Sequence, residues 1–180
     1  MEIGETKEWI AEAIIRLLKS KSYSDITIAN ITDEARLGRR TFYRHFKSKD
    51  EVIELISLRL IDDFTANLLE KQAASLAEMM ECYFEFWEAN IDVFLLLKEA
   101  RLLYCIEENI VDLVLKIALK VGRVPNDLEA AKQIINDHKY EFAYKLAGFW
   151  KLTIVWSEET PRKSPTEMSR IITEFMRVVR

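Results

Sequence analysis

This chain of 180 residues has little of what interrupts helices or builds reactive sites: four glycines, three prolines, two cysteines and two histidines. So few glycines and prolines favour long helices over strands joined by tight turns. The glycines are scattered along the chain, whereas a phosphate-binding loop needs them close together. No G-x-S-x-G nucleophile elbow occurs either. We therefore expect an all-α protein that is not an enzyme.

The residues that bind metals or form disulfides are equally sparse. Cys82 and Cys105 belong to no C-x-x-C pair, so two buried thiols in a reducing compartment are the simplest interpretation. Asp137, His138 and Glu141 are close in sequence, but such a group at a helix start is more often solvated than metal-bound. We expect no metal and no cofactor.

Long uncharged apolar runs are also missing. No apolar stretch reaches the length of a membrane span, and the acidic first twenty residues are typical of neither a signal peptide nor a transit peptide. We therefore expect a cytoplasmic protein with no membrane partner.

What is present is centred on residues 26–52, ITIANITDEARLGRRTFYRHFKSKDEV. The pattern predicts a short helix capped by Thr27, a tight turn, a second short helix over residues 39–46, and the start of a third. Phe42 and Phe46 lie four residues apart and share one face, so we expect them to anchor the second helix in the core. The other side chains of that helix then face outward.

Within this stretch, the segment from Arg36 to Lys49 contains no acidic residue and six basic ones: Arg36, Arg39, Arg40, Arg44, Lys47 and Lys49. Up to Asp50, ten basic residues outnumber eight acidic ones, which gives this part a charge of +2 and leaves −6 for the remainder of a chain of net charge −4. A basic helix on a helix-turn-helix suits the DNA major groove. An acidic body behind a basic head directs DNA to one end of the molecule.

The segment resembles the signature of TetR/AcrR-type transcriptional regulators, most specifically in T-F-Y-R-H-F followed by S-K, residues 41–46 and 48–49. The signature covers the N-terminal third of the chain. The resemblance implies a three-helix helix-turn-helix head of residues 1–47, and a helical effector-binding and dimerisation body of residues 48–180. About nine helices are expected in all.

The resemblance also assigns roles to positions of this sequence. Those that touch phosphates are Thr27, Tyr43, His45 and Lys49, and those that can reach base edges are Arg39, Arg40, Thr41 and Arg44. Arg36 joins this candidate surface, but it stands where the family usually has glycine, so we expect strain at a positive φ. Arg40 stands where a small residue is frequent, so the base preference cannot be taken from relatives.

Apolar periodicity extends the helical prediction through the body. The expected helices cover residues 6–21, 48–71, 74–89, 94–99, 102–121 and 139–156, followed by a last amphipathic helix. Ser48 and Glu51 form an S-x-x-E capping box. Ser164, Pro165 and Glu167 give the last helix a cap, a proline at its first position and a glutamate at its third.

Two groups of body residues are candidate sites. Large adaptable side chains with one arginine could line an effector cavity: Phe64, Tyr83, Trp87, Phe94, Arg101, Tyr104 and Phe142. Residues 139–156 are apolar on almost all sides, so one face is expected to meet a second copy of the chain. The expected dimer contacts are Phe149, Leu152, Trp156, Ile172, Phe175, Met176 and Val179.

We therefore expect a homodimeric DNA-binding transcriptional regulator that binds a palindromic duplex and is released by a small-molecule effector. The resemblance implies repression more often than activation, and the residues leave the sign of regulation open. Two other classes remain. One is a helical interaction module whose basic head docks an acidic protein, and the other is a small helical enzyme, for which the sequence offers no catalytic constellation. For each body residue, plain core packing is the competing interpretation.

Overall fold

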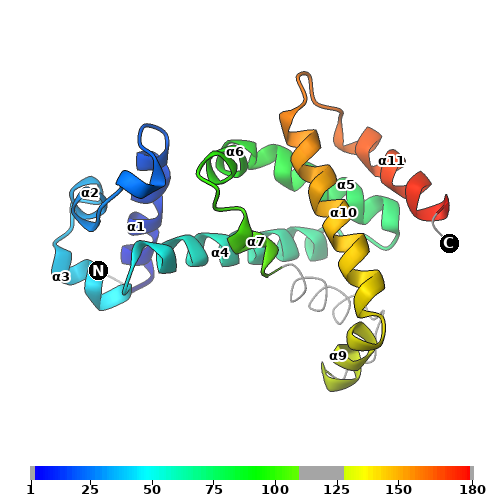
Figure 1. Ribbon diagram of the computed structural model, residues 1–180, viewed down its shortest axis with the longest axis horizontal. Helices are drawn as coiled ribbons and strands as arrows, with labels where there is room; N and C mark the ends of the chain where they lie inside the picture. The colour runs from blue at the N-terminus through cyan, green and yellow to red at the C-terminus, as the bar shows by residue number, and fades with distance from the viewer. Residues whose placement is uncertain (1–2, 110–127, 179–180) are drawn as a thin grey trace. The chain divides into compact units, whose positions relative to one another are not determined.

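The structure is a computed structural model that describes residues 3–109 and 128–178. Within these residues the secondary structure is entirely helical, with ten α-helices and one 3-10 helix, which confirms the all-α fold (Figure 1). The elements are α1 (Ile3–Leu18), η1 (Tyr23–Asp25), α2 (Ile28–Glu34), α3 (Arg39–His45), α4 (Lys49–Glu70), α5 (Leu76–Ala89), α6 (Ile91–Glu99), α7 (Tyr104–Glu107), α9 (Leu128–Asp137), α10 (Lys139–Glu158) and α11 (Pro165–Val178).

The chain folds into two compact units. The first comprises Met1–Leu60 with Asp92–Ile106, and the second comprises Ile61–Ile91 with Glu107–Arg180. The long helix α4 contributes residues to both units. The division of function after residue 47 stays a prediction, because compactness alone does not say which residues bind DNA or an effector.

In the first unit, α1 supplies the core face behind the helix-turn-helix. Ile10, Ile14 and Leu17 follow the three-four spacing of an amphipathic helix and are buried. The outer side of α1 is tied to α2, where Arg16 Nε donates to Glu34 Oε1 at 2.6 Å. The helix begins and ends three residues earlier than residues 6–21, and it still braces α2 as expected.

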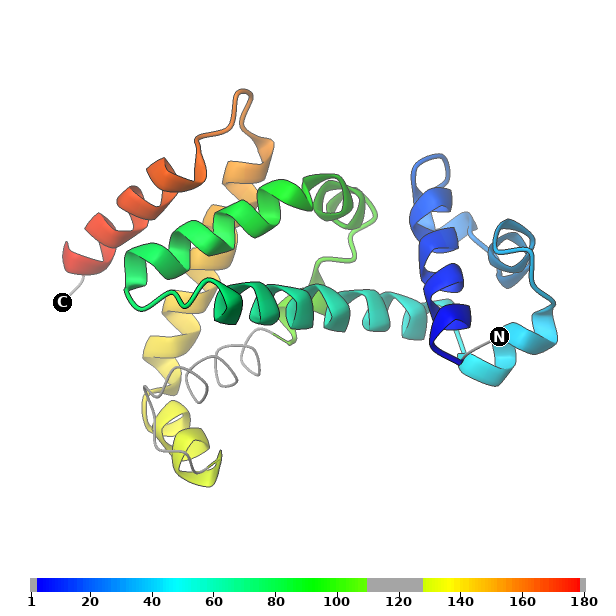
Figure 2. The ribbon, with the colours of Figure 1, turned by 180° about the vertical axis from the view of Figure 1, so that it is seen from behind.

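In the second unit, α11 lies along α5 (Figure 2). Met168 and Ile172 of α11 are buried, and Ser169 Oγ donates to the carbonyl oxygen of Ala77 at 2.6 Å. The cap predicted for α11 is present: Glu167 Oε2 accepts from the Ser164 N–H at 2.9 Å, and Ser164 Oγ accepts from the Glu167 N–H at 3.3 Å. These bonds fix where α11 begins.

A cluster of aromatic rings fills the core of the second unit. Tyr83 is its centre: its ring lies 5.5 Å from that of Phe64, 4.6 Å from that of Phe149 and 6.2 Å from that of Trp87. The Tyr83 hydroxyl pairs with Thr153 Oγ1 at 3.0 Å. Burial raises the pKa of Tyr83. Edge-to-face packing of this kind adds stability beyond the area that it buries.

Three predictions about the helices need correction or qualification. The predicted helix over residues 94–99 begins at Ile91, because Asn90 alone ends α5 and the next helix follows at once. The first half of α10 is not buried within one chain: Tyr140 and Tyr144 are 81% and 74% exposed. Of the helix predicted over residues 102–121, α7 is described, and positions 110–121 lie outside the described residues.

Candidate nucleic-acid interface

The helix-turn-helix begins with a complete cap on α2. Thr27 Oγ1 accepts a hydrogen bond from the Asn30 N–H at 3.2 Å, and Asn30 Oδ1 accepts one from the Thr27 N–H at 3.1 Å. The sequence predicted the cap at Thr27 but not the reciprocal role of Asn30, since a capping box usually has glutamate or glutamine there. The Thr27 hydroxyl also donates to Asn30 Oδ1 at 3.0 Å. Thr27 therefore fixes the start of the motif.

The turn between the two helices depends on Arg36. Its φ is 55°, the left-handed conformation that favours glycine and was expected at this position. The Leu37 N–H donates to the Thr32 carbonyl oxygen at 2.8 Å, and the Arg36 N–H to that of Asp33 at 3.1 Å. This pair of bonds is a Schellman motif, which ends α2 and redirects the chain into α3.

The inner face of α3 is anchored by the two predicted phenylalanines. Phe42 is fully buried and Phe46 is nearly so, and their ring centroids are 5.8 Å apart. Lys7 of α1 places its ammonium 5.7 Å from the centre of the Phe46 ring. These contacts fix the rotation of α3 about its axis, and with it the direction of every other side chain on the helix.

The outer face of α3 is basic and open to solvent. Tyr43 is 58% exposed, and an open concavity is lined by Arg40, Thr41, Tyr43 and Arg44. The contacts described for this face include no ion pair, and Arg44 Nη2 lies 3.5 Å from His45 Nε2. Burial, and then the charges of Arg44 and Lys7, lower the pKa of His45. The arginines thus present their positive charge outward.

Lys49, which is predicted to touch a phosphate, bonds to the backbone of its own chain. Its Nζ donates to the carbonyl oxygens of Tyr23 and Ile26, at 2.6 and 2.9 Å. The Tyr23 hydroxyl in turn donates to Asp50 Oδ1 at 2.6 Å. Burial, and then this bond, raise the pKa of Tyr23. Lys49 and Asp50 therefore fasten the η1 loop to the start of α4, a role that sequence spacing did not reveal.

The capping box predicted for α4 forms with a shifted partner. Ser48 Oγ accepts from the Glu51 N–H at 3.3 Å, as expected, but Glu51 Oε2 accepts from the N–H of Lys47 at 2.7 Å. The Glu51 carboxylate thus accepts from the N–H of the residue before Ser48, and not from that of Ser48 itself as in a regular capping box. The result is a fixed connection between α3 and α4.

The seven candidate effector residues are divided between the two units. Phe64, Tyr83, Trp87 and Phe142 lie in the second unit, and Phe94, Arg101 and Tyr104 in the first. In the second unit, Phe64 and Trp87 pack against Tyr83 inside the aromatic core. In the first, Phe94 is fully buried, whereas Tyr104 is exposed. Their shared role as an effector cavity stays a prediction.

Arg101 has a backbone role that the sequence did not suggest. Its φ is 60°, the Leu102 N–H donates to the Leu97 carbonyl oxygen at 2.8 Å, and the Arg101 N–H donates to that of Lys98 at 3.0 Å. Arg101 therefore ends α6 with the same motif that Arg36 uses after α2.

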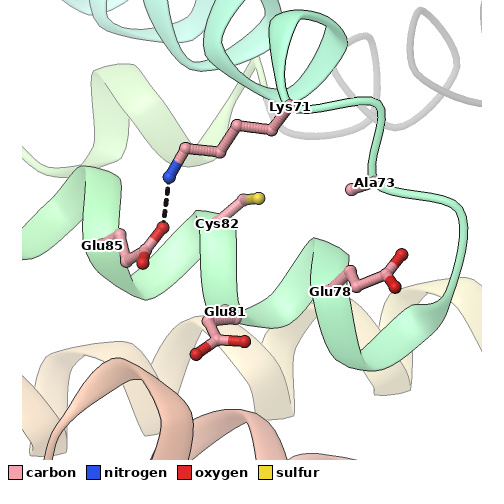
Figure 3. A pocket seen from close by; sticks show the side chains of 6 residues that line it. All are labelled: Lys71, Ala73, Glu78, Glu81, Cys82 and Glu85. Atoms are coloured by element: carbon pink, nitrogen blue, oxygen red, sulfur yellow. Dashed lines mark hydrogen bonds and ion pairs between the residues drawn. The ribbon is translucent and has the colours of Figure 1, made fainter.

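A second concavity lies beside α5 and is shown in Figure 3. Its carboxylates already have structural partners: Glu85 pairs with Lys71, Glu81 accepts from Thr166, and Glu78 caps α5. Cys82 is a buried thiol, and burial raises its pKa. Among the described residues, no three His, Cys, Asp or Glu side chains are arranged so that they could hold a metal ion. The arrangement offers no reactive chemistry.

The candidate dimer residues differ in exposure. Trp156 and Ile172 are buried within the chain, and Trp156 Nε1 donates to the Lys163 carbonyl oxygen at 2.8 Å. Phe149 and Leu152 are half-buried, whereas Phe175 and Met176 are exposed. Val179 lies outside the described residues. The exposed pair gives α11 an apolar outer edge.

Across residues 3–109 and 128–178, no helix is both long and apolar enough to cross a membrane.

Comparison with known proteins points to the same segment. The family profile described as "Bacterial regulatory proteins, tetR family" matches residues 10–56, from α1 into α4. An uncharacterised HTH-type transcriptional regulator of Haemophilus influenzae is 32% identical over 88 residues, which cover 49% of this chain and 46% of that protein. The HTH-type dhaKLM operon transcriptional activator DhaS of Lactococcus lactis is 33% identical over 51 residues, 28% of this chain and 27% of DhaS.

The matches thus span less than half of either relative, and the family profile ends within α4. The family profile covers the part of this chain whose geometry is described above: the capped α2, the tight turn and the anchored basic α3. Proteins of this family are generally DNA-binding regulators rather than enzymes. Residues 10–56 of this chain are therefore similar to the helix-turn-helix segment of the tetR family of bacterial regulatory proteins.

Proposed function

We propose that this regulator binds a palindromic DNA site as a homodimer, with α3 of each subunit in the major groove. One observation carries the proposal: α3 buries Phe42 and turns a basic face, with exposed Arg40, Tyr43 and Arg44, toward solvent. The groove admits one α-helix. In a two-fold dimer, the two copies of α3 would read half-sites about 34–36 Å apart.

The dimer is supported by apolar side chains that one chain leaves uncovered. Tyr140 and Tyr144 of α10 and Phe175 of α11 are 81%, 74% and 60% exposed, and Met176 is exposed beside Phe175. Exposed apolar side chains that lie together on a surface often mark interaction sites. A second copy of the chain is the simplest partner, since a palindromic site requires two-fold symmetry.

The proposal extends to release by a small-molecule effector and to repression. The support is the richness of the second unit in aromatic side chains, which suit apolar ligands, together with the family. Effector and DNA would each weaken the other's binding by the same factor. Repression is the more frequent mode in the family, although DhaS is named an activator. A reporter assay with and without the protein decides whether it represses or activates transcription.

The test is selection from a duplex pool with a randomised centre, followed by titration of the winning duplex across a salt series. We expect an enriched palindrome, two subunits per duplex and a steep fall of affinity with salt. Arg44→Ala should remove most of that affinity. Lys163→Ala is the matched control, because it removes one positive charge from an exposed pair with Glu159 in the other unit.

Absence of any enriched sequence would overturn the proposal. If Arg44→Ala then weakened capture of an acidic protein instead, the basic face would belong to an interaction module. If the enriched sequence were not a palindrome, or if one subunit bound each duplex, the proposal of DNA binding would stand and that of a dimer would be overturned.

A further inference from the structure

The packing of Phe42 determines which side chains of α3 face the DNA most directly. Successive residues of an α-helix are about 100° apart around the axis. Arg40 and Arg44 therefore lie about 160° from Phe42, one on each side, and Phe42 is fully buried. No other pair on α3 points so directly away from the core.

The remaining polar side chains of α3 stand on the two flanks. Arg39 and Tyr43 lie about 60° and 100° from Phe42 on one side, and His45 and Thr41 lie at similar angles on the other. Flanking positions on a helix in the major groove face the walls of the groove, where the phosphates are. The floor, where the base edges lie, faces Arg40 and Arg44.

Arginine at these two positions favours one base. The guanidinium is a planar fork of donors, and guanine offers two adjacent acceptors, O6 and N7, on its major-groove edge. Adenine presents one acceptor beside a donor, and thymine one acceptor beside a methyl group. Arg40 and Arg44 are both exposed, and no described carboxylate forms an ion pair with either one.

We infer that Arg40 and Arg44 each read a guanine, and that the two guanines lie about two base pairs apart in each half-site. With α3 running along the groove, the four residues from Arg40 to Arg44 rise about 6 Å and one base pair rises about 3.4 Å, which sets this spacing. This inference rests on the proposed DNA-binding function and goes beyond it by naming the bases and the residues that select them. Arg40 is central, since the resemblance supplied no base preference at its position.

The competing role for both arginines is contact with phosphate. A phosphate contact carries no sequence information, so its loss weakens all duplexes alike and lowers the salt dependence. Loss of a guanine contact instead weakens binding only to duplexes that carry that guanine. The two roles are therefore separable by experiment.

The experiment uses the full chain and the duplex selected from the randomised pool. Each guanine of the half-site is replaced in turn by 7-deazaguanine, which keeps base pairing but lacks the N7 acceptor. We expect roughly a ten-fold loss of wild-type affinity at the guanine read by Arg40, and no further loss in Arg40→Ala. Arg44→Ala should behave likewise at the second guanine.

Arg39→Ala is the matched control, an exposed arginine on the flank of the same helix. It should weaken binding to the natural and modified duplexes equally. All three side chains are exposed, so the variants should keep the wild-type melting temperature and circular dichroism spectrum.

Three outcomes would overturn the inference. A selected palindrome without required guanines, or a 7-deazaguanine effect that persists in both alanine variants, leaves the proposed function intact and removes the base assignment. Failure to select any duplex overturns the proposed function, and this inference with it.

Discussion

The ammonium group of Lys49 lies 2.6 Å from the carbonyl oxygen of Tyr23 and 4.3 Å from the centre of the Tyr23 ring. The same ammonium donates to the Ile26 carbonyl oxygen. Lys49 thus bonds to both ends of the η1 loop and stabilises the entry into α2. A lysine that uses its donors in this way has fewer left for a phosphate.

Lys49→Met tests this role. It keeps the apolar stem and removes the ammonium, so we expect a loss of about 1 kcal/mol or more in the free energy of unfolding. The slope of DNA affinity against salt should not change. Lys47→Met, at an exposed position two residues earlier, is the control. A slope reduced by about one, with unchanged stability, would show that Lys49 contacts a phosphate instead.

Arg36→Gly should stabilise the protein. Arg36 has a φ of 55°, where a side chain is disfavoured and glycine is not. The gain should stay below about 1 kcal/mol, because glycine also makes the unfolded chain more flexible. Chemical denaturation measures it. Arg39→Gly, inside α3, should destabilise the protein, and a gain in that variant would mean that backbone strain is not the cause.

Thr27→Ala should cost about 1 kcal/mol of stability, because the Asn30 N–H loses the hydroxyl that caps α2. Thr27→Ser keeps the hydroxyl and should retain most of the wild-type stability. Urea denaturation of both variants measures the difference. Equal losses in the two variants would show that the methyl group matters rather than the cap.

Glu78→Gln tests the acid sensitivity of α5. Hydrogen bonds from the N–H groups of Ser75 and Ala74 lower the pKa of Glu78 below its ordinary value of 4.5. The folded state therefore holds the proton less firmly than the unfolded chain, so this contribution is present above pH 4.5 and is lost as the pH falls through the lower, folded value. Melting temperatures across this range should show wild type and variant converging in acid. Glu88→Gln, an exposed position on the same helix, controls for the charge change.

Phe175→Glu should weaken the proposed dimer. Phe175 is 60% exposed in the single chain, so a charge there costs little in the monomer but would be buried in the interface. Light scattering over a dilution series should show the variant as a monomer at concentrations where the wild type is dimeric. Trp9→Glu, at a partly exposed apolar residue of the first unit, is the control. A dimer that survives Phe175→Glu would place the interface elsewhere.

Local chemistry was predictable wherever a few neighbouring residues decide the outcome. The caps at Thr27 and Ser164 each follow from residues within one turn of the chain, whereas the positive φ of Arg36 was expected from the family resemblance. The anchoring of α3 by Phe42 and Phe46 also follows from near neighbours, because their spacing matches one helical face. The resemblance to TetR/AcrR-type regulators was most specific at residues 41–46 and 48–49, and the family profile matches residues 10–56.

Contacts between distant residues were not predictable in this way. The charge of Lys49 suits a phosphate, and only the folded position of η1 reveals that its ammonium also reaches the carbonyl oxygens of Tyr23 and Ile26. Nor did sequence spacing indicate that Tyr83 would lie among the rings of Phe64, Phe149 and Trp87. Likewise, Trp156 and Phe175 are both large and apolar, but one is buried and the other exposed.

The sequence by itself therefore determined the helical fold and the helix-turn-helix, since these depend on periodicity and on bonds between near neighbours. The tertiary structure decided which face of each helix is covered, and hence which basic and apolar side chains remain available to a partner. That choice depends on the packing of residues far apart in the chain, because burial is shared among elements whose relative positions no local pattern encodes.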